Sequence, residues 1–267
     1  MSTRLYKYSF LFFLDVDELP NDRDQIAQDP SDNIFRFMDV AAEKHEVFLP
    51  IEGYQKMPLV SLEKALEPLI PILPNISPKV QVAKIRAKEP ADGLTPDQSA
   101  AIILYTMEWE PRDQCLYFAL NSRLRTADRN QLKPWFLFLK LILTGLARLP
   151  SVQKTVYRGV KLDLTSQHRE GDEFFWWGFS SCTTTMRVLQ ADEFLGNKGI
   201  RTFFVIECVN GKDIRHHSYY EREEEILLLP ATYFRVKAII EMAPDLHAIQ
   251  LVEIKPQYTY LEPVDEQ

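Results

Sequence analysis

The chain has 267 residues, which is enough for one large domain or for one domain with an appendage. Its apolar fraction of 46% and charged fraction of 26% are ordinary for a globular protein, and its net charge is −7. No basic stripe interrupts this acidic balance, which disfavours binding to nucleic acid.

Residues 1–45 contain a possible strand over 6–16 and a short helical stretch over 34–43, and we expect them to form an N-terminal extension. The five apolar residues 10–14 are too few for a signal peptide, so the sequence predicts a cytoplasmic protein. Its three cysteines, Cys115, Cys182 and Cys208, lie far apart and show neither metal-ligand spacing nor a disulfide framework, which fits a reducing compartment.

Recurrent prolines limit residues 46–91 to short helices and extended connections. A helix start follows, with Thr95 as cap, Pro96 at the first helical position and Gln98 completing a capping box, and the helix should run to about Met107. Further helices are predicted over 114–124 and 134–149. The last is apolar nearly all round and therefore buried, and its charged residues and length argue against a membrane span.

Beyond residue 150 the pattern changes to short β-rich runs divided by polar turns. The predicted strands cover 155–158, 173–179, 202–208, 224–229, 234–242 and 248–254, with one helix over 186–194. Helices followed by a mostly antiparallel sheet indicate an α+β domain.

The first of three candidate motifs covers residues 156–160, where Arg158 ends an apolar strand and Gly159 follows. This arrangement places a permanent positive charge where the backbone is open to close approach. The alternative is an ordinary surface arginine at a strand end.

The second motif is a hydroxyl-rich row of small residues, 180–183, after an apolar strand, in which only Cys182 has no hydroxyl. Ser181 and Thr183 share a face if the strand continues, and both can donate to a ligand oxygen. The alternative is a helix cap. No histidine and aspartate accompany the serines in a hydrolytic arrangement, so a catalytic triad is not expected.

The third motif is the acidic run that enters the apolar strand at 226–229. In an extended chain Glu223 and Glu225 point to one face and Glu224 to the other. Two carboxylates aimed together suit a cationic transition state or substrate, whereas the alternative is a solvated acidic turn.

In this order, and together with the helix start at Thr95, the three motifs resemble the arginine-specific mono-ADP-ribosyltransferases. The branch in question is the R-S-E clade, which includes vertebrate ecto-enzymes and cholera-type toxins, and the likeness covers about residues 50–258. It implies an ADP-ribosyltransferase-like fold, with N-terminal helices packed on a split, mostly antiparallel β-sandwich that contains an NAD cleft. The catalytic domain would cover 46–260 and a tail 261–267.

The resemblance assigns NAD as co-substrate, with no metal. It implies that Arg158 holds the NAD phosphates, that Gly159 contacts the nicotinamide carboxamide through its backbone, and that Ser181 contacts the nicotinamide ribose and orients the catalytic acid. The family's Ser-Thr-Ser motif reads Ser-Cys-Thr here, so Thr183 keeps the last hydroxyl. Phe194 is a candidate for stacking on nicotinamide, although a phenylalanine on a helix face also suits a core.

Glu225 matches the family's catalytic acid, which stabilises an oxocarbenium-like centre when the nicotinamide–ribose bond breaks. Glu223 resembles the second acid, which holds the incoming guanidinium of a target arginine. The expected partner is therefore an arginine-containing protein or a small guanidino compound, and the expected enzyme is a monomeric arginine ADP-ribosyltransferase. NAD glycohydrolysis and an inactive NAD-binding module are the alternatives.

The segment 211–224 corresponds to the loop that meets the target protein in such enzymes. We interpret its adjacent His216 and His217 as solvated surface groups rather than metal ligands. Trp176 and Trp177 are expected to pack on opposite faces of the sheet.

Overall fold

The computed structural model describes residues 46–185, 195, 198–220 and 224–264. The stretches predicted as a strand over 6–16 and as helices over 34–43 and 186–194 lie outside these residues. The described helices are α2 (Leu62–Leu66), α3 (Ile76–Arg86), α4 (Pro96–Thr106), α5 (Leu116–Leu124) and α6 (Phe136–Arg148). The described strands are β1 (Ser151–Val160), β2 (Glu173–Trp176), β3 (Ser180–Thr183), β4 (Arg201–Asp213), β5 (Glu225–Leu228), β6 (Thr232–Ala243) and β7 (Leu246–Glu253).

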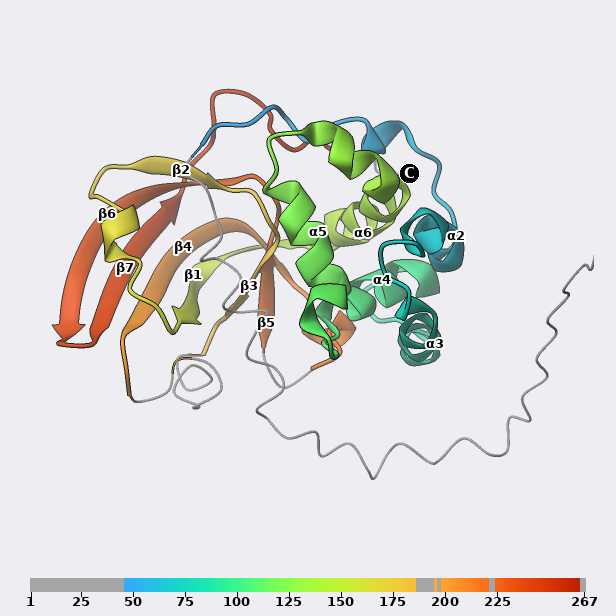
Figure 1. Ribbon diagram of the computed structural model, residues 1–267, viewed down its shortest axis with the longest axis horizontal. Helices are drawn as coiled ribbons and strands as arrows, with labels where there is room; N and C mark the ends of the chain where they lie inside the picture. The colour runs from blue at the N-terminus through green and yellow to red at the C-terminus, as the bar shows by residue number, and fades with distance from the viewer. Residues whose placement is uncertain (1–45, 186–194, 196–197, 221–223, 265–267) are drawn as a thin grey trace, which may run out of the picture. The chain divides into compact units, whose positions relative to one another are not determined.

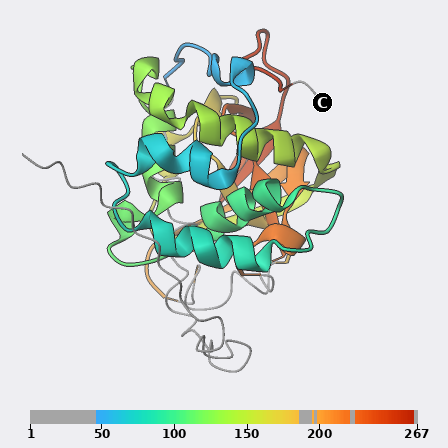
Figure 2. The ribbon, with the colours of Figure 1, turned by 90° about the vertical axis from the view of Figure 1, so that its right-hand side faces the viewer.

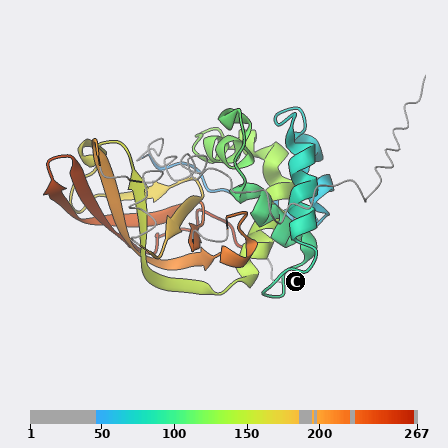
Figure 3. The same cartoon turned by 90° about the horizontal axis from the view of Figure 1, so that it is seen from below.

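The helices form a layer against one side of the sheet. Figure 1 shows α2–α6 beside the strands, and Figure 2 shows the same helices in front of them. From below, the strands gather on one side and the helices on the other (Figure 3). Helices precede strands in the chain and segregate to one face, so the predicted α+β class is confirmed.

Helix α4 begins as the sequence predicts. The Thr95 hydroxyl accepts a hydrogen bond from the Gln98 backbone N–H at 3.2 Å, and the Gln98 side chain accepts one from the Thr95 N–H at 3.0 Å. This complete capping box satisfies two backbone donors that have no partner within the helix. It fixes the start of a helix whose residues are almost all buried.

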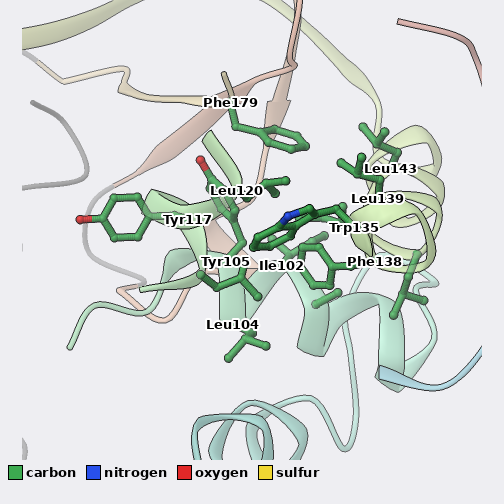
Figure 4. Close-up of a cluster of buried hydrophobic side chains, with 14 of the residues drawn as sticks. Ile102, Leu104, Tyr105, Tyr117, Leu120, Trp135, Phe138, Leu139, Leu143 and Phe179 are labelled. Atoms are coloured by element: carbon green, nitrogen blue, oxygen red, sulfur yellow. The ribbon is translucent and has the colours of Figure 1, made fainter. Parts of the chain in front are cut away.

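Aromatic and branched side chains fill the space between the helices and the sheet. Trp135 and Phe138 lie against Ile102 and Leu139, and Phe179, from the segment before β3, reaches into the same cluster (Figure 4). Helix α6 is buried along most of its length, as its all-round apolar pattern predicts. Within the described part of the chain, no helix combines the length and the apolar character needed to span a membrane.

The seven described strands form one sheet in the order β1-β3-β5-β4-β7-β6-β2, and β1 also pairs with β4. Every pairing is antiparallel except that of β4 with β7. The predicted, mostly antiparallel arrangement is thus confirmed. The pair β3–β5 lies between the ends of β1 and β4, and all three sequence motifs belong to strands β1, β3 and β5 or enter them.

The predicted single strand over 173–179 is wrong. Strand β2 ends at Trp176, the chain leaves the sheet, and β3 starts at Ser180. The break lies at Gly178, where an added Cβ atom would come within 2.8 Å of the Arg125 side chain. Trp176 and Trp177 do pack in different clusters, one with the sheet interior and one with the helices, as predicted.

The C-terminal residues pack against the start of the described chain. Leu261 forms a parallel bridge with Ile51, and the Tyr54 hydroxyl donates to the carbonyl oxygen of Glu262. Val264 contacts the helical core. The boundary predicted at residue 260 therefore falls inside a region of tertiary contact.

Candidate active site

Arg158 is fully buried, so the alternative of a surface arginine is wrong. Its Nη1 donates a hydrogen bond to the backbone oxygen of Ser181 at 2.7 Å, which joins the first motif directly to the second. Tyr157 is the β1 residue paired with Thr183 of β3. Because side chains alternate along a strand, Arg158 lies on the face opposite Tyr157. The contact with β3 is made between the Arg158 guanidinium and a backbone oxygen of that strand.

Gly159 lies where another side chain comes very close. A Cβ atom added there would be 3.0 Å from Cδ1 and 3.1 Å from Cβ of Leu195. Leu195 itself is buried with Phe203 and Ala248. The absence of a Cβ atom at Gly159 thus lets the Leu195 side chain pack against this backbone, and its predicted contact with nicotinamide stays a prediction.

The hydroxyl row forms strand β3 itself rather than following the end of a strand. Ser181 is paired with Leu227 and Thr183 with Glu225, so both hydroxyl side chains lie on the face that carries the Glu225 carboxylate. Thr183 also accepts a hydrogen bond from the Thr185 N–H at 3.2 Å, a local turn contact of the kind expected of a cap. Among the described residues the Ser181 hydroxyl has no hydrogen-bond partner.

Glu225 is the first residue of β5 and its side chain has 0% exposure. Its Oε2 accepts a hydrogen bond from the Ser218 hydroxyl at 3.0 Å. The alternative of a solvated acidic turn is therefore wrong for Glu225, although its neighbour Glu224 is exposed. Glu223 and Phe194, the other two candidate site residues, lie outside the described residues.

The alternation predicted across the acidic run fails at Glu224. This residue has φ 46°, in the left-handed region, so the extended strand begins only at Glu225. The Glu224 carboxylate accepts hydrogen bonds from the hydroxyls of Thr184 at 2.9 Å and Thr185 at 2.5 Å. These bonds, with that from Thr185 the stronger, lower the pKa of Glu224, and they tie the end of β3 to the start of β5.

Cys182 is the buried residue of β3 between Ser181 and Thr183. Burial raises the pKa of its thiol to about 12, the nearby Arg158 charge opposes this shift, and Glu225 adds to it. The thiol is therefore neutral near pH 7 and packs as a small apolar side chain. Arg158 and Glu225 both adjoin β3, the first through the Ser181 oxygen and the second through its pairing with Thr183.

His217 is buried at 0% exposure, so its interpretation as a solvated surface group is wrong. Its Nδ1 lies 2.9 Å from the Ser99 hydroxyl of α4, and its Nε2 lies 3.2 Å from the Asp92 carboxylate. Burial lowers the pKa of His217, and Asp92 partly offsets this shift. Although the order resembles a catalytic triad, Ser99 is buried, so these contacts anchor the loop to the helices. The described residues contain no cluster of potential metal ligands.

Two positioning contacts could not be found from the sequence. Besides Ser218, the buried Asn121 of α5 makes a pair of bonds with the backbone of Phe179, two residues before Ser181. Its Oδ1 accepts from the Phe179 N–H at 3.0 Å, and its Nδ2 donates to the Phe179 oxygen at 3.1 Å. No spacing rule connects residues that lie 58 positions apart.

The profile of ART, the family described as NAD:arginine ADP-ribosyltransferase, matches residues 74–259 of this chain. The chain belongs to this family. It is accordingly an enzyme that uses NAD as co-substrate, a mono-ADP-ribosyltransferase of the arginine-modifying class. No curated protein sequence matches it.

Solved structures of ADP-ribosyltransferases share the fold. The Vis toxin of Vibrio splendidus, in complex with agmatine, superposes with a TM-score of 0.50 at 20% identity, covering 77% of this ART chain and 92% of the toxin. A mutant of the eukaryotic mono-ADP-ribosyltransferase ART2.2 in complex with NAD gives a TM-score of 0.52 at 17% identity, with 74% and 86% covered. A second ART2.2 mutant, in complex with NADH, gives 0.51 at 17% identity, with 78% and 94% covered.

Proposed function

We propose that this chain transfers ADP-ribose from NAD to a guanidino nitrogen, either of an arginine in a target protein or of a small guanidino compound. Glu225 is the catalytic acid in this proposal. The observation that carries it is a fully buried carboxylate at the first residue of β5, held by a hydroxyl and paired across the sheet with Thr183.

The reaction requires a negative charge at a fixed position. When the bond between nicotinamide and ribose breaks, its electron pair leaves with neutral nicotinamide, and positive charge builds on the ribose carbon and ring oxygen. A carboxylate shielded from water interacts more strongly with this charge than one in solvent, and it needs no reorganisation during the step. The guanidino nitrogen then bonds to the ribose carbon and loses a proton, a step that we assign to Glu223.

The remaining candidates bind NAD in this proposal. Arg158 neutralises the phosphates, because a guanidinium matches two phosphate oxygens at once. Gly159 offers its backbone to the nicotinamide carboxamide, and Ser181 and Thr183 offer hydroxyls on the Glu225 face. Phe194 is the proposed stacking partner of the nicotinamide ring. Support comes from the burial of Arg158 and Ser181 and from the crowded backbone at Gly159.

The test follows nicotinamide release and ADP-ribosyl-agmatine formation by mass spectrometry, with NAD and agmatine as substrates. We expect Glu225→Gln to slow both by about 10²–10³-fold while NAD still binds. Glu223→Gln should remove transfer to agmatine and leave some hydrolysis. Glu224→Gln is the matched control, since it alters the exposed acid between them and should cost less than about tenfold.

Three outcomes would contradict the proposal. Full activity in the Glu225 variant would exclude this residue as the catalytic acid. Release of free ADP-ribose without any labelled agmatine or protein arginine would favour NAD glycohydrolysis. Equal loss of transfer and hydrolysis in Glu223→Gln would contradict the separate role proposed for that acid.

A further inference from the structure

Ser218 is buried and lies seven residues before Glu225. Its hydroxyl donates to Oε2 of Glu225 at 3.0 Å and accepts a hydrogen bond from the Tyr220 N–H at 3.2 Å. A hydroxyl has one hydrogen. The Tyr220 N–H is a donor and the carboxylate is an acceptor, so the hydroxyl hydrogen points to the carboxylate while the oxygen accepts from Tyr220.

The residues on both sides of Ser218 are held by the helical layer. His217 contacts Ser99 of α4 through its ring. The Tyr219 N–H donates to the Thr106 hydroxyl at 2.8 Å.

Arg86, at the end of α3, adds a third contact to the same loop. Its guanidinium donates to the Tyr219 oxygen at 2.9 Å and lies 4.0 Å from the centroid of the Tyr219 ring. At the base of the loop, the Ile214 N–H donates to the backbone oxygen of Glu225 at 3.1 Å. The Ser218 hydroxyl is therefore a fixed point rather than a group on a free loop.

We propose that Ser218 is a positioning residue that holds the Glu225 carboxylate in the orientation needed for nicotinamide cleavage. The inference rests on the proposed role of Glu225. It also divides the work of two serines, because Ser218 holds the acid while the Ser181 hydroxyl, which bonds no described residue, remains for the ligand. The family resemblance implied both tasks for Ser181.

The effect should appear in kcat rather than in NAD affinity. Without the Ser218 hydroxyl, the carboxylate loses one of the contacts that fix its orientation, and a smaller fraction of molecules holds it in the productive conformation. A hydrogen bond to a charged group corresponds to about a 10- to 100-fold change in rate. We expect a loss of this size, with the KM for NAD changed by less than about threefold.

The experiment measures kcat and KM for nicotinamide release from NAD with agmatine present, together with the melting temperature. Ser218→Ala should show the loss in kcat, and Ser218→Thr, which keeps a hydroxyl, should recover most of it. Ser218→Cys is closest in shape but a weak donor, so it should resemble the alanine variant even if the latter folds poorly. Unchanged kcat in the folded alanine or cysteine variant would overturn the proposal.

Ser99→Ala is the matched control for loop placement. It removes another buried hydroxyl that holds the same loop, through His217, without touching Glu225. We expect it to lower the melting temperature and to change kcat by less than about threefold. If it reduced kcat as much as Ser218→Ala does, the hydroxyl of Ser218 would have no specific role.

A double-mutant cycle separates this inference from the function on which it rests. In Glu225→Asp the shortened acid no longer reaches Ser218, so adding Ser218→Ala should cost less than about twofold more. The same 10- to 100-fold loss in both backgrounds would overturn the positioning role. If Glu225→Gln kept full activity, the catalytic assignment itself would be wrong. If Glu225→Gln lost activity while Ser218→Ala kept it, only the positioning role of Ser218 would be wrong.

Discussion

Replacing Asn121 with alanine should destabilise the protein through two backbone groups that lie far from it in sequence. The Asn121 amide satisfies both the N–H and the oxygen of Phe179, at a point where the chain has left β2 and not yet entered β3. A buried backbone group left without a partner costs about 1–3 kcal/mol. For two such groups, with some relief from water, we expect a loss of about 2–4 kcal/mol in the free energy of unfolding.

Urea unfolding and thermal melting measure this loss. For a domain of this size, 1 kcal/mol corresponds to roughly 2–4 °C, so the melting temperature of Asn121→Ala should fall by roughly 5–15 °C. Asn121→Asp should be at least as destabilising, because it keeps the acceptor for the Phe179 N–H but turns a buried negative charge toward the Phe179 oxygen. Ser122→Ala, on the exposed face of the same helix, is the control and should stay within about 0.5 kcal/mol of wild type. A loss as small as this in Asn121→Ala would refute the reasoning, since it would show that Phe179 does not depend on the amide.

Three further predictions concern other contacts of the same domain. Gly178→Ala should cost about 1–3 kcal/mol in urea unfolding, because the new Cβ would meet the buried Arg125 side chain at 2.8 Å; wild-type stability would show that Arg125 can move. Since burial lowers the pKa of His217, the unfolded state binds the extra proton more readily, so stability should fall as the pH drops below about 6.5, the unfolded value. Melting curves from pH 7.5 to 5.5 should show a smaller fall in His217→Gln, and an equal fall would show that the pH dependence does not come from His217. Deletion from Leu261 onward should lower the melting temperature through loss of the bridge to the start of the domain, whereas a free tail could be removed without effect.

The sequence predicted best those structural features that depend on residues close together in the chain. The capping box at Thr95 and Gln98 depends on residues three positions apart, and the structure has it as predicted. The run over 202–208 lies in the first part of β4, because its aromatic and β-branched residues favour a strand. The α+β class followed from the order of such elements.

The predictions were wrong where contacts between residues far apart in the sequence determine the local structure. The apolar run over 173–179 looks like one strand, and only contacts with α5 explain why it breaks at Gly178. His217 looks like a loop residue, yet Ser99, 118 positions away, gives it a buried partner. The backbone of Glu224 is left-handed and breaks the strand alternation. The sequence gives no sign of this, because the residue there is not a glycine.

The candidate site also depends on contacts with the helices that are distant in sequence. Strands β3 and β5 have only four residues each, and β3 is joined to β1 at a single residue pair, Tyr157 with Thr183. Strands so short gain little rigidity from their own ladder. The structure compensates with helical contacts, one at Phe179 just before Ser181 and the other around Ser218, which holds Glu225. The Ser181 hydroxyl and the Glu225 carboxylate, on which the proposed chemistry depends, are thus placed by the helical layer, and loosening this layer should lower activity before the sheet unfolds.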